Sequence, residues 1–266
     1  MFLIPWYVTL CVAQGVLVVI PAVGRDSTTR RGALVGLVGP ALAMVVGVGL
    51  VALLGGAGAS LLSWLGTVAT PVLAGSLGWI ARWRWPAATA VVAAALYIVA
   101  WRTEGRESEI AAMLLIGGAC LTIAGFVGPI TPARYLALGI VGLVVLDTIL
   151  VFWTPLVSET TVALHHATLT PVSVAGGQAR PLPGLQQIEL GNSVMGWLDF
   201  LAPALLGAVI GRQTTPRLLA GAVVAIASML FGLLLIDVTD KLPATVPVLA
   251  GLAVTWRHWW RRKPLE

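Results

Sequence analysis

Long apolar runs separated by short polar connections recur along the whole chain. Most of them are about 20 residues long, which is the length that an α-helix needs to cross a bilayer. The polar/apolar alternation of membrane β-strands is absent, so helices are expected to satisfy the backbone hydrogen bonds. The pattern predicts an all-α, polytopic membrane protein with about nine transmembrane helices, at residues 2–23, 33–55, 59–81, 85–101, 109–128, 133–155, 191–211, 217–236 and 242–258.

The composition agrees with a membrane protein, and the charge gives its expected orientation. The chain is 58% hydrophobic and 10% charged, whereas a soluble domain has about 25% charged residues. The net charge of +5 would suggest a nucleic-acid partner, but most basic residues follow alternate apolar segments. Under the positive-inside rule these residues face the cytoplasm, so the N-terminus is expected outside and the C-terminus inside. The basic residues on this side are Arg25, Arg30, Arg31, Arg82, Arg84, Arg134, Arg212, Arg217, Arg257, Arg261, Arg262 and Lys263.

The positive charge therefore reflects membrane topology, and no nucleic-acid partner is expected. We expect an integral protein of the cell membrane of a prokaryote. Residues 1–132 hold the first five helices, which are expected to form a scaffold. Residues 133–266 hold helices six to nine, with a long connection at residues 156–190. This connection is rich in proline and glycine, which break helices, and the parity of the spans places it outside the cytoplasm.

Two acidic residues interrupt the apolar segments. Of the eleven Asp and Glu residues, only Asp147 and Asp199 lie in the middle of a predicted span, where an ionisable side chain is costly and usually functional. The same number of positions, 13, separates Asp147 from Arg134 and Asp199 from Arg212. At about 1.5 Å per residue, both carboxyls lie roughly 20 Å from the cytoplasmic side, level with each other. Neighbouring helices could therefore bring them face to face.

Paired aspartates are typical of general acid/base catalysis. Two close carboxyls cannot both ionise easily, so they share a proton. One can then activate water while the other protonates the departing group or polarises the carbonyl. A proton relay or ion site in a transporter uses buried acids equally often, and a structural polar contact is the third interpretation. The two acids alone leave these alternatives open.

The residues around the acids resemble the presenilin and signal peptide peptidase family of intramembrane aspartyl proteases. Gly196-Trp197-Leu198-Asp199 is similar to the Gly-x-Gly-Asp motif of that family, Leu146-Asp147 to its Tyr-Asp motif, and Leu242-Pro243-Ala244-Thr245 to its Pro-Ala-Leu motif. The order of the motifs, the nine spans and the long loop between spans six and seven also fit. Pro203, four residues after Asp199, resembles the signal peptide peptidase branch. The resemblance covers segments six to nine by motif and the first five by hydropathy.

This resemblance implies a presenilin-like fold in which residues 133–266 are the catalytic half. It implies Asp147 and Asp199 as the catalytic pair, with no cofactor and no metal, acting on transmembrane peptides or proteins and on leftover signal peptides in the bilayer. Substrate-binding residues would be Gly196, Leu198, Pro243, Ala244 and Thr245. The chain departs from the family pattern at Leu146, Leu198 and Thr245, where the family has tyrosine, glycine and leucine, and Leu198 adds bulk beside the acid.

Two further expectations concern the backbone near Asp199. Pro203 has no N–H to donate to the carbonyl of Asp199, so that carbonyl is left free beside the acid. The stretch 185–190 follows Pro183-Gly184 and ends where segment seven begins. It is expected either to pair with an unwound substrate as an added strand or to be a solvated tether.

Other functions are compatible with parts of the pattern. A prepilin-peptidase-like protease also uses a Gly-x-Gly-Asp acid, but such enzymes lack the Pro-Ala-Leu element and keep their acids toward the cytoplasm. A transporter or a catalytically silent relative is the alternative from a different class. Ion flux that requires Asp147 and Asp199 without peptide cleavage would favour the transporter.

Overall fold

The computed structural model describes residues 4–20, 30–153, 160, 162–163, 171–172, 180–181, 184–185, 187–190, 193–211, 213–235 and 243–260. Helices account for most of these residues, and four short strands lie between α6 and α8. Each of the nine apolar segments contains one helix. The elements are α1 Ile4–Val19, α2 Arg30–Leu54, α3 Gly56–Ile80, α4 Pro86–Arg102, α5 Arg106–Ile130, α6 Ala133–Trp153, β1 Pro171–Val172, β2 Arg180–Pro181, β3 Gln187–Leu190, β4 Ser193–Gly196, α8 Trp197–Ile210, α9 Thr214–Leu235 and α10 Pro247–Trp260.

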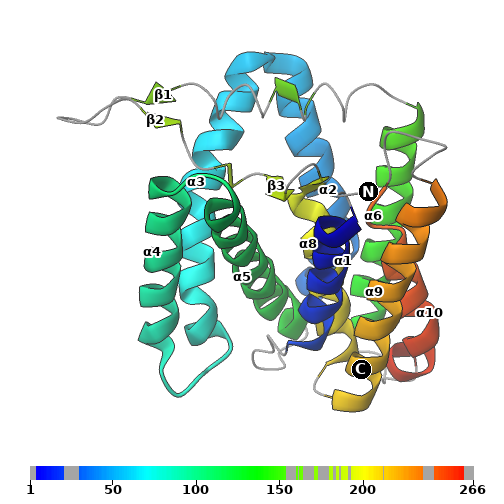
Figure 1. Cartoon of the computed structure of the whole chain (residues 1–266). Helices are drawn as coiled ribbons and strands as arrows, with labels where there is room; N and C mark the ends of the chain where they lie inside the picture. Colours follow the sequence, from blue (N-terminus) through cyan, green and yellow to red (C-terminus); the bar gives the residue numbers. More distant parts are fainter. Residues whose placement is uncertain are drawn as a thin grey trace.

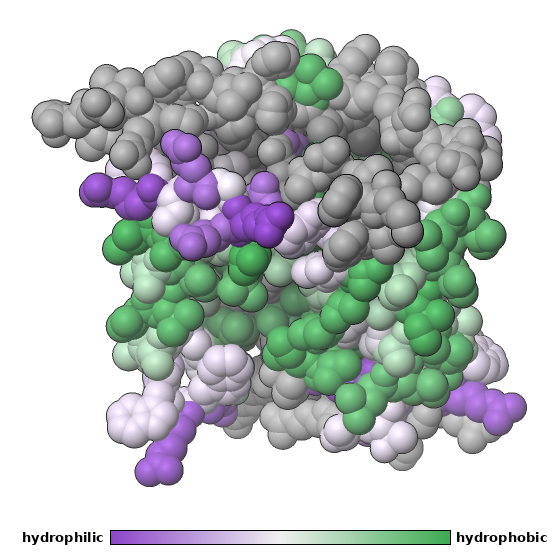
Figure 2. Space-filling model, in the orientation of Figure 1, coloured by the Kyte–Doolittle hydropathy of each residue, from purple (hydrophilic) through white to green (hydrophobic). Residues whose placement is uncertain are grey.

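The fold is that of an all-α membrane protein. Within the described residues, five helices are long and apolar enough to cross a bilayer: α2, α3, α5, α6 and α9. The apolar helices α1, α4 and α8 are shorter. Hydrophobic side chains form a band across the visible face of the molecule, with hydrophilic side chains above and below it (Figure 2). Such a band is expected where lipid chains replace water as the solvent.

Consecutive helices alternate in direction (Figure 1). The junction of α2 and α3 lies on the same side as the strands, whereas the junctions of α3 with α4, α5 with α6 and α8 with α9 lie on the opposite side. Segment ends that carry Arg82, Arg84, Arg134 and Arg217 therefore share one side, as the parity of the sequence predicts. The orientation of that side in the membrane stays a prediction.

The centre of the molecule is one large apolar core to which α1, α5, α6 and α8 contribute. Leu10, Ile116, Ile140, Phe200 and Leu206 are fully buried in it. Helix α1 packs against α8 and α9, and α6 packs against α2, α8 and α10. A smaller cluster joins α3, α4 and α5 at one edge of the fold. The two predicted acidic helices are thus neighbours in the middle of the bundle.

The predicted start of segment seven is wrong. Residues 193–196 do not belong to a helix but form β4, which pairs antiparallel with β3. Helix α8 begins only at Trp197, because Gly196 caps it and the Asp199 carboxyl accepts the Gly196 N–H. Hydropathy could not separate the two elements, because a short apolar strand looks like the first turn of an apolar helix. The remainder of the predicted loop 156–190 lies largely outside the described residues.

Segment nine also begins later than predicted. Residues 243–246 form a turn, and α10 begins at Pro247. In the turn, the N–H of Val246 donates to the carbonyl of Pro243 at 3.2 Å, and the N–H of Val248 donates to Thr245 at 3.1 Å. Proline is well suited to the first position of a helix, where its missing N–H is not needed. The short turn before it displaces Ala244 and Thr245 from helical positions.

Candidate active site

Asp147 lies in α6 and faces the interior of the bundle. Its side chain is 6% exposed, and the fully buried Thr245 donates its hydroxyl to Oδ2 of Asp147 at 2.6 Å. The backbone of Thr245 also faces this carboxyl. A buried carboxyl without such partners would be strongly destabilising. The turn before α10 therefore supplies the polar environment of the first acid.

Asp199 occupies the third position of α8. Gly196, the N-cap residue, donates its backbone N–H to Oδ2 of Asp199 at 2.8 Å. This is the reverse arm of a capping box, in which an acid in the first turn accepts the N-cap N–H. A carboxylate here is also favoured by the helix dipole. The local sequence Gly-x-x-Asp thus positions the second acid by starting a helix beside it.

The structure brings the two acids together. Helices α6, α8 and α10 pack against one another, and the carboxyls of Asp147 and Asp199 are close enough to interact electrostatically. Oδ2 of Asp147 accepts the Thr245 hydroxyl, and Oδ2 of Asp199 accepts the Gly196 N–H. Each acid is thus held by a donor of its own while it lies near the other acid.

The other predicted site residues lie around this pair in different ways. Gly196 is exposed and has φ −72°, a conformation open to any residue. A Cβ atom here would lie 3.4 Å from Oδ2 of Asp199, an ordinary contact, so the contribution of Gly196 is its backbone N–H. Leu198 is half-buried and packs against the core. Pro243 is buried and Ala244 half-buried in the turn that carries Thr245.

Strands β3 and β4 form a hairpin directly before α8. Leu190 pairs with Ser193 and Glu189 with Val194. Two residues separate the strands, so Leu190 and Ser193 form a hydrogen-bonded pair, and the N–H groups of Glu189 and Val194 point away from the hairpin. The N–H of Gly196, two residues after Val194, points away from the hairpin in the same way and donates to Asp199. The β4 edge is therefore the edge next to the acids. Stretch 185–190 does contain a strand, and its own pairing with substrate is untested. Its partner strand β4 has the edge nearer the acids.

One buried polar residue of the site was not predicted. Gln14 in α1 is fully buried and donates its side-chain amide to the backbone carbonyl of Asp199 at 3.1 Å. The signal in the sequence is a glutamine inside an otherwise apolar segment, where polar side chains usually bind another helix. Its partner could not be read from the chain, because 185 residues separate the two positions.

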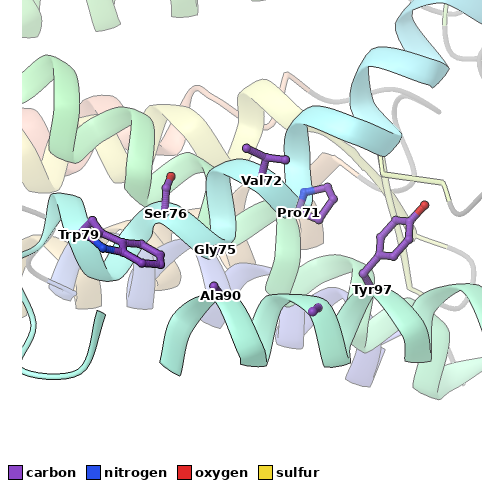
Figure 3. Close-up of a pocket in the computed structure, with 8 residues that line it drawn as sticks. Pro71, Val72, Gly75, Ser76, Trp79, Ala90 and Tyr97 are labelled. Carbon is purple, nitrogen blue, oxygen red and sulfur yellow. The ribbon is translucent and has the colours of Figure 1, made fainter. Parts of the chain in front are cut away.

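An open groove lies elsewhere, between α3 and α4 (Figure 3). It has a volume of about 370 Å³, and Pro71, Trp79 and Tyr97 line it. Its walls carry no acid, histidine or cysteine, so nothing there supports acid/base chemistry. In the described part of the chain, no three His, Cys, Asp or Glu side chains are grouped to hold a metal ion.

No protein-family model, curated protein or solved structure matches the chain. The resemblance to the presenilin and signal peptide peptidase family therefore rests on the motifs of the sequence and stays a prediction.

Proposed function

We propose that the protein is an intramembrane aspartyl endopeptidase that cleaves transmembrane segments or leftover signal peptides within the bilayer. The observation that carries the proposal is the arrangement of Asp147 and Asp199. Each is held through Oδ2 by an uncharged donor, the Thr245 hydroxyl for Asp147 and the Gly196 N–H for Asp199. The nearby carboxyls interact electrostatically. A proton shared between two such groups gives one acid and one base in the same site.

The chemistry follows from that shared proton. The ionised carboxylate removes a proton from water as the water oxygen bonds to the peptide carbonyl carbon. The protonated carboxyl donates its proton to the carbonyl oxygen, which gives a neutral gem-diol. A carboxylate then removes a proton from one hydroxyl while the other carboxyl protonates the nitrogen. The C–N bond breaks, and the products are a carboxylic acid and an amine.

The surroundings of the acids suit an extended backbone. A peptide bond inside a helix is shielded, so a helical substrate must unwind locally, and its freed polar groups need new partners in the membrane. The outward N–H of Val194 on β4 is such a partner. We infer that the substrate adds to the β4 edge, which carries its scissile bond toward Asp199. The positive-inside rule places the connection between the two acids outside the cytoplasm. By resemblance to signal peptide peptidase, this orientation implies substrates whose N-terminus is cytoplasmic, such as leftover signal peptides.

The test is cleavage of a transmembrane peptide by the purified full-length protein in lipid vesicles, with products identified by mass spectrometry. Asp147→Asn and Asp199→Asn should each abolish cleavage while the protein stays folded, because an amide keeps the volume and loses the exchangeable proton. Glu107→Gln, at an exposed acid in the first turn of α5, is the control and should cleave normally.

Two results would contradict the proposal. Substantial cleavage by either aspartate variant would exclude this pair as the catalytic acids. Ion flux that depends on Asp147 and Asp199, in the absence of any peptide cleavage, would assign the protein to the transporters instead.

A further inference from the structure

Helix α1 approaches the catalytic helices closely enough for backbone contact. A Cβ atom on Gly15 would lie 2.6 Å from the carbonyl oxygen of Gly221 in α9, and one on Gly207 in α8 would lie 2.7 Å from that of Val18. Only glycine permits such an approach. Figure 1 shows α1 in front of the bundle centre with α8 and α9 beside it. A side chain on α1 can therefore reach the backbone of the site.

Gln14 lies where α1 comes close to the site, and both the nitrogen and the oxygen of its side-chain amide form hydrogen bonds. Its Nε2 donates to the carbonyl of Asp199 at 3.1 Å and to that of Ala244 at 3.3 Å. Its Oε1 accepts the hydroxyl of the buried Ser228 at 2.7 Å. Tyr7 donates its own hydroxyl to the carbonyl of Ser228 at 2.7 Å. The amide thus joins α8, α9 and the turn before α10, and each of its polar atoms has a partner.

Both carbonyls that Gln14 binds lack a backbone N–H donor for the same reason. In an α-helix the carbonyl of Asp199 would accept the N–H of residue 203, but Pro203 has none. In the turn before α10, the carbonyls of Pro243, Thr245 and Val246 each accept the N–H three residues ahead. The carbonyl of Ala244 would accept from Pro247, which again has no N–H. Two prolines therefore leave the carbonyls of two half-buried residues without a backbone donor, and the two amide protons of Gln14 match them.

We propose that Gln14 is a positioning residue that fixes the distance between the two catalytic acids. Through Asp199 it holds the start of α8, and through Ala244 it holds the residue before Thr245, which holds Asp147. The two acids are thereby linked through one side chain of the first helix. The inference rests on the proposed protease function, and it gives α1 a part in the site that the motifs do not contain.

The variant that tests this role is Gln14→Met, which keeps the length and apolar volume of the side chain and removes its donors. We expect kcat for a transmembrane peptide to fall by about tenfold or more with KM within about twofold, because geometry at the acids changes and substrate contacts do not. Thr122→Val is the matched control. It removes an interhelical hydroxyl–carbonyl bond of 2.8 Å between α5 and α3, and it should leave kcat unchanged.

A double variant separates positioning from general packing. Pro203→Ala gives the Asp199 carbonyl an N–H donor from its own helix. The loss of kcat caused by Gln14→Met should therefore be smaller in the Pro203→Ala background. If Gln14→Met does not fold, Ser228→Ala serves instead, because it removes only the donor that orients Oε1 of Gln14. A severalfold fall in kcat with unchanged KM is then expected.

The outcomes distinguish this inference from the proposed function. The role of Gln14 alone would be overturned if the wild type cleaves, Asp199→Asn does not, and Gln14→Met has the wild-type kcat. The same holds if Ser228→Ala, used in its place, has the wild-type kcat. An equal loss in the Pro203→Ala background, or in Thr122→Val, would overturn it too. Absence of cleavage by the wild type would overturn the proposed function, and this role with it.

Discussion

Thr245 offers the sharpest test of how the first acid is held, because its hydroxyl can be removed with almost no change of shape. The hydroxyl donates to Asp147 at 2.6 Å, and the two residues are 0% and 6% exposed. Water therefore has little access to replace the lost donor in Thr245→Val. Leucine, the residue that the family pattern has at this position, could not make the bond either.

The expected effect follows from the cost of an unsatisfied buried acceptor. Leaving such a group without its partner costs about 1–3 kcal/mol. If the missing donor lets the Asp147 carboxyl turn away from the substrate, the cost appears in the transition state. At about 1.4 kcal/mol per tenfold, kcat/KM should fall by roughly 5- to 150-fold. The assay is cleavage of a transmembrane peptide at several substrate concentrations, with thermal unfolding measured on the same samples.

Two controls make the prediction specific to the hydroxyl. Thr245→Ser keeps the donor and should stay close to the wild-type rate. Thr255→Val removes an equally buried hydroxyl from α10. Among the described residues this hydroxyl binds only carbonyls of its own helix, the closer being Gly251 at 2.7 Å. It should leave cleavage unchanged. The reasoning is refuted if Thr245→Val cleaves at the wild-type rate, or if Thr245→Ser is as slow as Thr245→Val.

Three further predictions concern stability, substrate binding and orientation. Gly15→Ala should lower the free energy of unfolding by about 1–3 kcal/mol through overpacking. Gly117→Ala is the control and should change it little, because its Cβ would lie 3.5 Å from its nearest neighbour. Equal unfolding curves for the two variants would contradict the close approach of α1. Val194→Pro removes the outward N–H on β4 and should lower kcat/KM, while Glu189→Pro on the opposite edge should not; equal rates for both would exclude pairing at β4. In Gln178→Cys, a membrane-impermeant thiol reagent should label the new cysteine from outside the cell only. Labelling only from the cytoplasm would contradict the predicted orientation.

The helices were predictable from the sequence because bilayer-length apolar runs leave the backbone few alternatives. Each predicted segment contains a helix in the structure. The ends were less predictable where local hydrogen bonds decide them. Asp199 accepts the N–H of Gly196 and starts α8 six residues after position 191, and Pro247 starts α10 after a turn. Hydropathy carries no information about either event.

The candidate site was predictable in part for a similar reason. An ionised side chain is so costly in an apolar segment that Asp147 and Asp199 are conspicuous, and the structure places them near each other. The contacts that hold them were not predictable. Thr245 looked like a departure from a motif, yet it donates to Asp147. Such contacts depend on which helices pack together, and spacing along the chain does not specify that.

The contact between the first helix and the last turn has a consequence for biosynthesis. Gln14 meets Asp199 and Ala244 across 185 and 230 residues of chain. A ribosome makes the N-terminal part first and at a limited rate, so α1 must wait in the membrane until α10 has been inserted. Until then the two acids have neither Thr245 nor the bridging amide. In the proposed protease, the active site would therefore be incomplete while the chain's own hydrophobic segments are being inserted. Proteolytic activity would arise only after insertion is complete.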